Sequence, residues 1–297
     1  RISGVYSFLG SHKFRVSYQT GFRMPTTQNQ YIDLLTPSAR LIGGLPFFRD
    51  RYNFDSNPVY DTETFFAFAA TGDPSVLDGN EGNSTELNLE QNNTIEVGYR
   101  SLIGERLLVD TYYYNSVFNN FSGAFNLFQS STEGDPSGLV NPVVYQTTVS
   151  LDQDVKSQGM ALGLSYALNG GYRLSGNYAW NELTNEDDLP EGFQSQFNTP
   201  EHKYNLTLSN RKLTDRFGFN LTWRWQDEFL WESTFAVGEV PAFGTFDAQV
   251  SYSLPDIKSR LKVGGSNLLN NRYEQAIGNP TVGALYYVSI TFDELLN

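Results

Sequence analysis

The fold is decided by the stretch Phe217-Gly218-Phe219-Asn220-Leu221-Thr222-Trp223-Arg224-Trp225-Gln226. Large apolar side chains stand at its odd positions, and small or polar side chains stand at the even positions. In an extended chain successive side chains point to opposite faces, so a period of two separates an apolar face from a polar face. The stretch therefore predicts a β-strand over residues 216–227 with one face in an apolar environment.

The same alternation returns along the whole chain, for example in segments 14–22, 160–168, 204–208 and 286–292. No segment shows a convincing helical period. These patterns predict an all-β protein with eleven strands, at about residues 1–9, 13–23, 92–101, 106–121, 157–168, 172–183, 202–211, 216–227, 244–254, 260–268 and 284–292.

The connections between the predicted strands alternate strictly between short and long. The short turns are 10–12, 102–105, 169–171, 212–215 and 255–259, and the long polar loops are 24–91, 122–156, 184–201, 228–243 and 269–283. Short turns at one end and long loops at the other are typical of an antiparallel transmembrane β-barrel of the bacterial outer membrane. We therefore expect the short turns in the periplasm and the long loops outside the cell. The Phe-rich piece Thr64–Ala69 of the first loop is expected to add a short strand or turn there.

Composition removes several other classes. The 297 residues include 33 acidic and 20 basic side chains, and the net charge of −13 argues against a nucleic-acid-binding surface. There is no cysteine, and the two histidines, His12 and His202, are too far apart in sequence to form a recognisable metal motif. No run of 18 apolar residues is present, which excludes a transmembrane helix. A barrel strand remains compatible with this low hydropathy, because only every second residue faces lipid.

The predicted strand number points to part of a larger barrel. Single-chain bacterial barrels have an even number of strands, whereas the chain supplies eleven. Eleven is half of the 22 strands of plugged outer-membrane transporters. We therefore interpret residues 1–297 as the C-terminal half of one transmembrane barrel domain.

Three segments resemble the barrel of TonB-dependent receptors, and more particularly the receptors of Bacteroidota. The run from Phe14 to Pro25, which ends in Gly-Phe-Arg-Met-Pro, is similar to a family strand that leads into a large outer loop. The run from Leu87 to Tyr99, with Glu90, resembles the returning strand. Residues 262–273, continued by 278–280 and 286–292, look like the closing hairpin, although the chain continues past Phe292 to Asn297, whereas family members usually finish at an aromatic residue.

The resemblance implies TonB-energised import of a scarce, large nutrient through a plugged barrel in the outer membrane. An N-terminal plug, a TonB-engaging segment and the first half of the barrel are expected outside these residues. Implied partners are outer-membrane lipid and lipopolysaccharide, TonB and the imported ligand. The resemblance leaves open whether a surface lipoprotein lids the barrel, as it does in the glycan and peptide importers of the family. The resemblance leaves the substrate open among iron chelates, corrinoids, glycans and peptides, because a fold does not specify a ligand.

Candidate ligand residues are sought in the outer loops. Arginine suits carboxylates and phosphates, and aromatic faces suit sugars and flat chelating groups. The residues that meet this description are Arg49, Arg51, Tyr52, Tyr60 and Trp231. The alternative is that these side chains pack the loops on one another.

The run Ser259-Arg260-Leu261-Lys262 fits the Ser-x-x-Lys nucleophile pattern, but it lies in a predicted periplasmic turn without the partner motifs. We therefore expect no enzyme activity and no cofactor. The loop Asp78–Asn83 has many oxygen ligands for calcium, but its spacing departs from the EF-hand pattern and favours a solvated acidic loop. Two other functions remain open. One is a smaller outer-membrane barrel enzyme, similar to a protease or lipase, which would need a histidine–acid pair at the outer rim near His202. The other is a passive porin without a plug.

Overall fold

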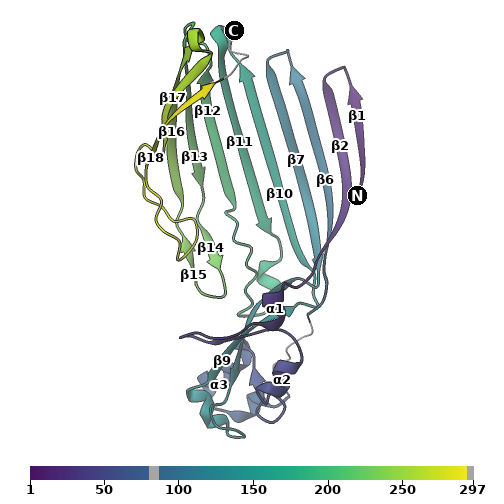
Figure 1. Ribbon diagram of the computed structural model, residues 1–297. Coiled ribbons are helices and arrows are strands. Elements are labelled where there is room, and N and C mark those ends of the chain that lie inside the picture. Colours follow the sequence, from purple (N-terminus) through teal and green to yellow (C-terminus); the bar gives the residue numbers. More distant parts are fainter. Residues whose placement is uncertain (80–86, 293–297) are drawn as a thin grey trace.

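Eleven long strands form one antiparallel sheet whose spatial order is the order of the sequence (Figure 1). The computed structural model describes residues 1–79 and 87–292. The strands of the sheet are β1 (Ile2–Phe8), β2 (His12–Arg23), β6 (Glu90–Ile103), β7 (Leu107–Asn119), β10 (Val155–Ala167), β11 (Tyr172–Leu183), β12 (His202–Asn210), β13 (Phe217–Gln226), β16 (Phe243–Leu254), β17 (Ser259–Ser266) and β18 (Leu285–Phe292). The eleven predicted strands are confirmed, with boundaries that move by a few residues.

The register of the strands places residues of similar polarity opposite one another on neighbouring strands. In β13, Leu221 lies opposite Leu208 of β12 and Ala248 of β16. Its neighbour Thr222 lies between Thr207 and Asp247 on the other face. Apolar residues therefore lie beside apolar residues over the whole sheet, and polar residues lie beside polar ones.

The apolar face of the sheet is exposed rather than packed in a core. Examples are Val16 at 49%, Leu206 at 51% and Val263 at 51% exposure. A continuous exposed apolar surface of this extent is unstable in water and is typical of a surface covered by lipid. The small buried residues Ser17, Thr94 and Ser116 lie on the opposite, polar face.

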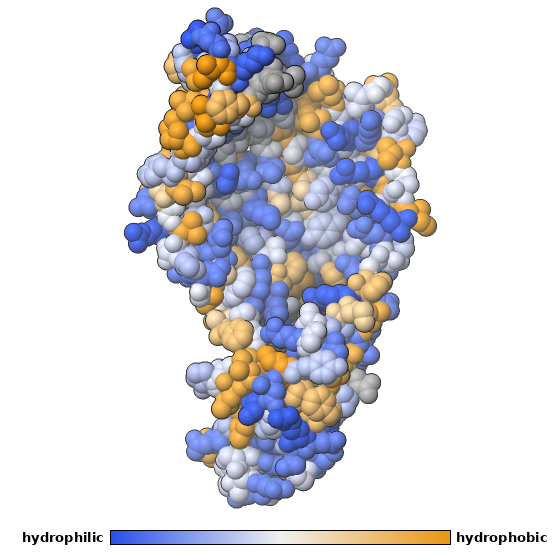
Figure 2. All heavy atoms as spheres, viewed as in Figure 1, coloured by the Kyte–Doolittle hydropathy of each residue, from blue (hydrophilic) through white to orange (hydrophobic). Residues whose placement is uncertain are grey.

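The sheet forms an open trough and is not closed into a barrel. Among the described residues, its two edge strands β1 and β18 each pair with only one neighbour. Figure 2, which looks into the trough, shows mostly blue and pale side chains in the hollow. The polar face is therefore the concave face. In the part of the chain that the structure describes, no helix is long and apolar enough to cross a membrane.

The first two long connections are not loops, and here the sequence interpretation was wrong. Together they build an outer subdomain around a five-stranded sheet in the order β3 (Asp33–Leu35), β4 (Arg40–Ile42), β9 (Val143–Ser150), β8 (Ser122–Gln129) and β5 (Val59–Tyr60). Figure 1 shows this subdomain beyond one end of the trough. Strands β3, β4 and β5 have only two or three residues, and β4 pairs with β9 from a distant part of the chain, so no local pattern revealed this sheet.

Helices also occur in these connections: α1 (Thr27–Tyr31), α2 (Phe47–Arg51), α3 (Thr62–Thr71), and the 3₁₀ turns η1 (Pro74–Leu77) and η2 (Pro136–Val140). The Phe-rich piece that was expected to be a strand or turn is the middle of α3. Asp61 caps this helix through a hydrogen bond from Thr64 N, and Gly72 ends it at φ 69°. These end signals favour a helix over the strand suggested by its phenylalanines.

The packed hydrophobic clusters lie in the outer subdomain and at its junction with the trough. One cluster comprises Ile42, Phe48, Phe54, Val59, Leu127 and Tyr145. A second lies where the subdomain meets the trough and includes Phe121, Val155 and Phe193.

The remaining connections are mostly short or irregular. The loop 228–243 contains a hairpin of β14 (Phe229–Glu232) and β15 (Val237–Val240), which the sequence interpretation missed. Three more 3₁₀ turns are η3 (Asn169–Gly171), η4 (Glu186–Asp188) and η5 (Pro255–Ile257). All predicted short turns lie at the end of the trough opposite the outer subdomain (Figure 1).

Candidate functional site: the concave face and the outer subdomain

The concave face contains a groove of about 560 Å³ that runs across several strands. Its wall includes Tyr112 of β7, Asn177 of β11, Lys203 and Asn205 of β12, and Arg224 of β13. Phe243 and Tyr273 also line it, and their rings stack with centroids 3.9 Å apart. The groove therefore combines basic, amide and aromatic groups.

Ion pairs join some of the charged residues on this face. The Arg15 guanidinium lies 3.5 Å from Glu96 and 3.6 Å from Asp110. Arg224 lies 3.0 Å from Asp247. These pairs link β2 to β6 and to β7, and β13 to β16.

Basic side chains outnumber acidic ones on the concave face. The alternation places Glu90, Glu96, Asp110 and Asp247 there, paired with Arg15, Arg23, Arg100 and Arg224. Five further basic residues of the described strands share this face and have no ion pair with a described acid: Lys13, Arg173, Lys203, Arg260 and Lys262. The face is thus positively charged, although the whole chain carries −13.

In the outer subdomain, Asp33 gathers two of the predicted ligand residues. Tyr52 donates its hydroxyl to the Asp33 carboxylate at 2.8 Å, and Arg51 lies 3.1 Å from it. Arg40, which the sequence interpretation missed, donates to the same carboxylate at 2.7 Å. No sequence motif connects Asp33 with Arg40, Arg51 or Tyr52. The pairing of β3 with β4 brings Arg40 close to Asp33.

The Asp33 cluster holds one negative and two positive charges. Burial raises the pKa of Asp33, but the hydrogen bonds from Arg40 and Tyr52 and the positive charge of Arg51 lower it below its ordinary value. Burial and the bond to Asp33 raise the pKa of Tyr52. The carboxylate is therefore ionised at neutral pH, and the Tyr52 hydroxyl is held in place.

The other predicted residues lie in different surroundings. Arg49 pairs with the exposed Asp55 at 3.1 Å. Tyr60 is in β5 and packs beside a cluster of Phe68, Leu77 and Leu139. Trp231 is in β14, in a separate two-stranded sheet. The structure thus brings Arg51 and Tyr52 together and leaves Trp231 in another element.

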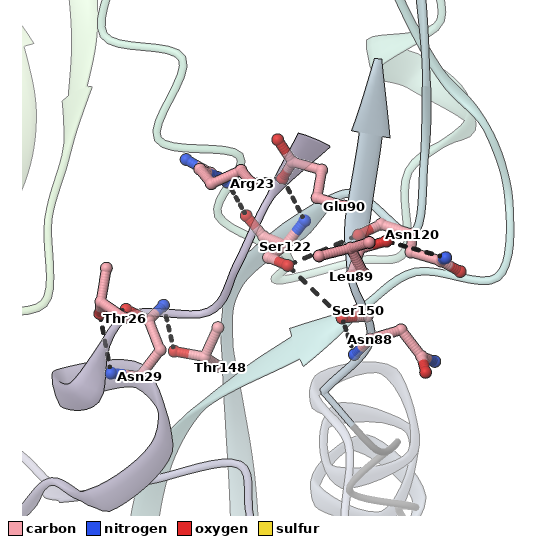
Figure 3. Close-up of polar contacts among 10 residues, drawn as sticks. All are labelled: Arg23, Thr26, Asn29, Asn88, Leu89, Glu90, Asn120, Ser122, Thr148 and Ser150. Atoms are coloured by element: carbon pink, nitrogen blue, oxygen red, sulfur yellow. Dashed lines mark hydrogen bonds and ion pairs between the residues drawn. The ribbon is translucent and has the colours of Figure 1, made fainter. Parts of the chain in front are cut away.

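A polar junction fixes the outer subdomain to the trough (Figure 3). Arg23 at the end of β2 lies 2.5 Å from Glu90 at the start of β6. The same Glu90 oxygen accepts the backbone N–H of Ser122, the first residue of β8, at 3.1 Å. Asn29 of α1 donates its side-chain amide to Thr148 of β9 at 3.2 Å. Glu90 is buried, so its bonds are shielded from water.

The enzyme alternative rests on His202, which lies on the convex face. Its Nδ1 is 2.8 Å from the Tyr178 hydroxyl, and its Nε2 is 3.4 Å from Glu201. In the described segments, no three His, Cys, Asp or Glu side chains form a group able to hold a metal ion. Residues 80–83 of the candidate calcium loop lie outside the described residues.

Comparisons with known proteins agree with this architecture. A family model described as "TonB dependent receptor-like, beta-barrel" matches residues 1–268. A search of curated protein sequences found no match. Among solved structures, the chain is similar to a mutant of the ferric enterobactin receptor of Pseudomonas aeruginosa, with a TM-score of 0.59 and 14% identity over 96% of this chain and 38% of that one.

Two further solved structures share the fold. The copper transporter OprC has a TM-score of 0.58 and 14% identity, covering 96% of this chain and 38% of its own. The unliganded ferric citrate transporter FecA has a TM-score of 0.54 and 15% identity, covering 97% of this chain and 37% of its own. The chain therefore spans less than two fifths of each of these proteins.

Proposed function

Because the chain belongs to the family of TonB-dependent receptor-like β-barrels, we propose that it forms part of an active transporter in the bacterial outer membrane. The eleven-stranded trough supplies about half of a barrel wall, and strands outside this chain complete the barrel domain. Residues 1–297 belong to that single domain. The observation that carries the proposal is the trough itself, which has an exposed apolar outer face and a polar, hollow inner face.

The two ends of the trough have different roles in this proposal. The long connections and the outer subdomain face the cell exterior, and the short turns face the periplasm. A barrel this wide needs a plug to preserve the permeability barrier, and TonB displaces the plug from the periplasmic side. The outer face contacts lipid and lipopolysaccharide, and a surface lipoprotein covers the outer opening.

The outer subdomain makes the first contacts with the nutrient. Arg51 exposes 58% of its side chain even while it pairs with Asp33, so its guanidinium remains available to an acidic ligand. Arg49, Tyr52, Tyr60 and Trp231 complete the proposed contact set. The nutrient belongs to one of four classes: iron chelates, corrinoids, glycans or peptides. Transport involves no covalent chemistry and no resident cofactor.

Uptake measurements in whole cells test this function. The full-length protein is produced in an outer membrane, and the accumulation of a labelled iron chelate, a corrinoid, an oligosaccharide and a peptide is measured separately. We expect accumulation of one of them against its gradient, and we expect it to cease without TonB or after a protonophore is added. Diffusive entry that continues without TonB and without energy would support the passive porin instead.

A further inference from the structure

We propose that the groove between Lys203 and Arg224 on the concave face binds a polyanionic solute. This inference rests on the proposed transport function and adds the charge of the transported molecule. It also places a binding site deeper than the outer subdomain, where the sequence analysis had located the ligand residues.

Lys203 is the central residue of the proposed site. It lies on the polar face of β12 and lines the groove, and its ammonium has no hydrogen bond or ion pair with any residue that the structure describes. Its cross-strand partner is Gln226, while Arg224 lies opposite Asn205. Lys203 and Arg224 are therefore diagonal neighbours on adjacent strands. Two like charges at this spacing repel each other, and a bound anion removes that repulsion.

Arg224 is only partly neutralised by its acidic neighbour. Asp247 exposes 13% of its side chain, whereas Arg224 exposes 58%. The guanidinium carries five N–H donors, so one carboxylate contact leaves donors directed to the groove. Arg224 can consequently hold Asp247 and a second acidic group together.

The rest of the groove suits a small solute. Asn205 donates its side-chain amide to Asn177 at 2.7 Å, and this bond leaves the carbonyl of Asn205 and the amide of Asn177 for a ligand. The stacked Phe243–Tyr273 pair closes one part of the wall with a flat apolar surface. A volume of about 560 Å³ is within the range of small-molecule sites.

The wider charge distribution supports the same occupant. Of the five unpaired basic residues on the concave face, Lys203 lines the groove, and Lys13, Arg173, Arg260 and Lys262 lie toward the short turns, so positive charge continues along the trough beyond the groove. A low-dielectric wall focuses this potential and raises the local concentration of anions. A neutral glycan gains nothing from such a surface, and a cationic peptide is repelled by it.

An equilibrium binding experiment tests the site. The full-length protein, purified in detergent, is titrated with pyrene-1,3,6,8-tetrasulfonate, a fluorescent aromatic tetra-anion that matches the basic and aromatic groups of the groove. Lys203→Gln should weaken binding about three- to tenfold, since it removes one charge-assisted contact. Asp247→Asn should strengthen binding, because it frees Arg224 while its side-chain oxygen can still accept the N–H of Asn267.

The control variant is Lys212→Gln. Lys212 is exposed in the turn between β12 and β13. Its replacement by Gln changes the net charge by the same amount as Lys203→Gln, but outside the groove. The proposal requires unchanged affinity in this variant and weaker binding of the probe at 0.5 M salt. Equal losses in Lys203→Gln and Lys212→Gln would overturn it, as would an undetectable wild-type affinity.

Another occupant of the same surface gives a different result. If an acidic protein segment of the full-length receptor covered the groove, Lys203→Gln would lower the melting temperature without changing the affinity for the probe, and the proposal would be wrong. Failure of probe binding in a protein that still performs energised uptake overturns the anion site alone. Intact probe binding without any uptake overturns the transport function alone.

Discussion

Asp33 joins three side chains of the outer subdomain. One carboxylate receives Arg40, Arg51 and the Tyr52 hydroxyl, which come from β3–β4 and from α2 and its end. Arg51 and Tyr52 could be selected from the sequence, but Asp33 could not. The partners of Asp33 lie 7 to 19 positions away from it without a repeating spacing. The structure joins Arg51 and Tyr52 through an acid that the sequence interpretation missed, and their role as ligand residues stays a prediction.

Replacing Asp33 by Asn should destabilise the outer subdomain at neutral pH. The change leaves two arginines without their shared anion, and the loss of hydrogen bonds to a charged group costs about 1–3 kcal/mol. Amide hydrogen exchange of residues 33–60 would measure this loss of stability, and exchange should be faster in Asp33→Asn than in the wild type. The control Asp55→Asn should change exchange little, because its pair with Arg49 is exposed.

The pH dependence has a defined sign. Since the pKa of Asp33 is lowered in the folded protein, its contribution is complete above the ordinary carboxyl pKa and is lost as the pH falls through the lower, folded value. The stability of the outer subdomain should therefore differ between the wild type and Asp33→Asn at pH 7, and this difference should disappear in strong acid. A difference that grew on acidification would contradict this assignment.

At the scale of elements, the long strands were predictable and the outer subdomain was not. Every strand of the trough has a solvent or lipid face and a lumen face, so its alternation is visible in the sequence. Strands β3, β4 and β5 have only two or three residues, and α1 and α2 have only five residues each. Such elements are stabilised by tertiary contacts rather than by a local pattern.

The groove residues Lys203 and Arg224 lie in strands that the alternation predicted. Lys203 and Arg224 stand at polar positions of strands that were predicted correctly, so both could be assigned to the inner face. The sequence could not show which of the inner basic residues lacks an acidic partner. That distinction depends on cross-strand register and on which strands become neighbours.

Strand β10 provides a test of the inner wall. A side chain at Gly159 would place its Cβ 2.6 Å from the backbone oxygen of Trp180 and 2.6 Å from the ring of Tyr114, whereas at Gly163 the nearest atom would be 3.5 Å away. Gly159→Ala should therefore destabilise the sheet by about 1–3 kcal/mol, while Gly163→Ala is tolerated. The folded fraction in outer membranes, measured by heat-dependent electrophoretic mobility, reports the difference. Equal behaviour of the two variants would contradict the described packing.

At the scale of the molecule, the two faces of the trough differ in polarity, and the packed clusters lie apart from most of the trough. Apolar side chains cover the convex face, and basic and amide groups cover the concave face. The packed hydrophobic clusters lie in the outer subdomain and at its junction with the trough. A water-soluble protein would hide the convex apolar surface in a core, so the arrangement fits a membrane wall with a folded cap at one end.

The junction around Glu90 connects these two parts. Arg23 and Glu90 belong to two of the three segments that carry the family resemblance, and the structure shows them in contact with each other and with the first residue of β8. The buried Glu90 carboxylate therefore links β2, β6 and β8 at this junction.

The measurement that tests the central claim most directly is the accessibility of single cysteines in whole cells, since the chain has no cysteine of its own. Ser38→Cys, between β3 and β4, and Asp215→Cys, in the turn between β12 and β13, are placed separately in the full-length protein. A membrane-impermeant maleimide should label position 38 in intact cells and position 215 only after the outer membrane is permeabilised. Labelling of position 215 in intact cells, with position 38 protected, would show that the wall is inverted and would contradict the account.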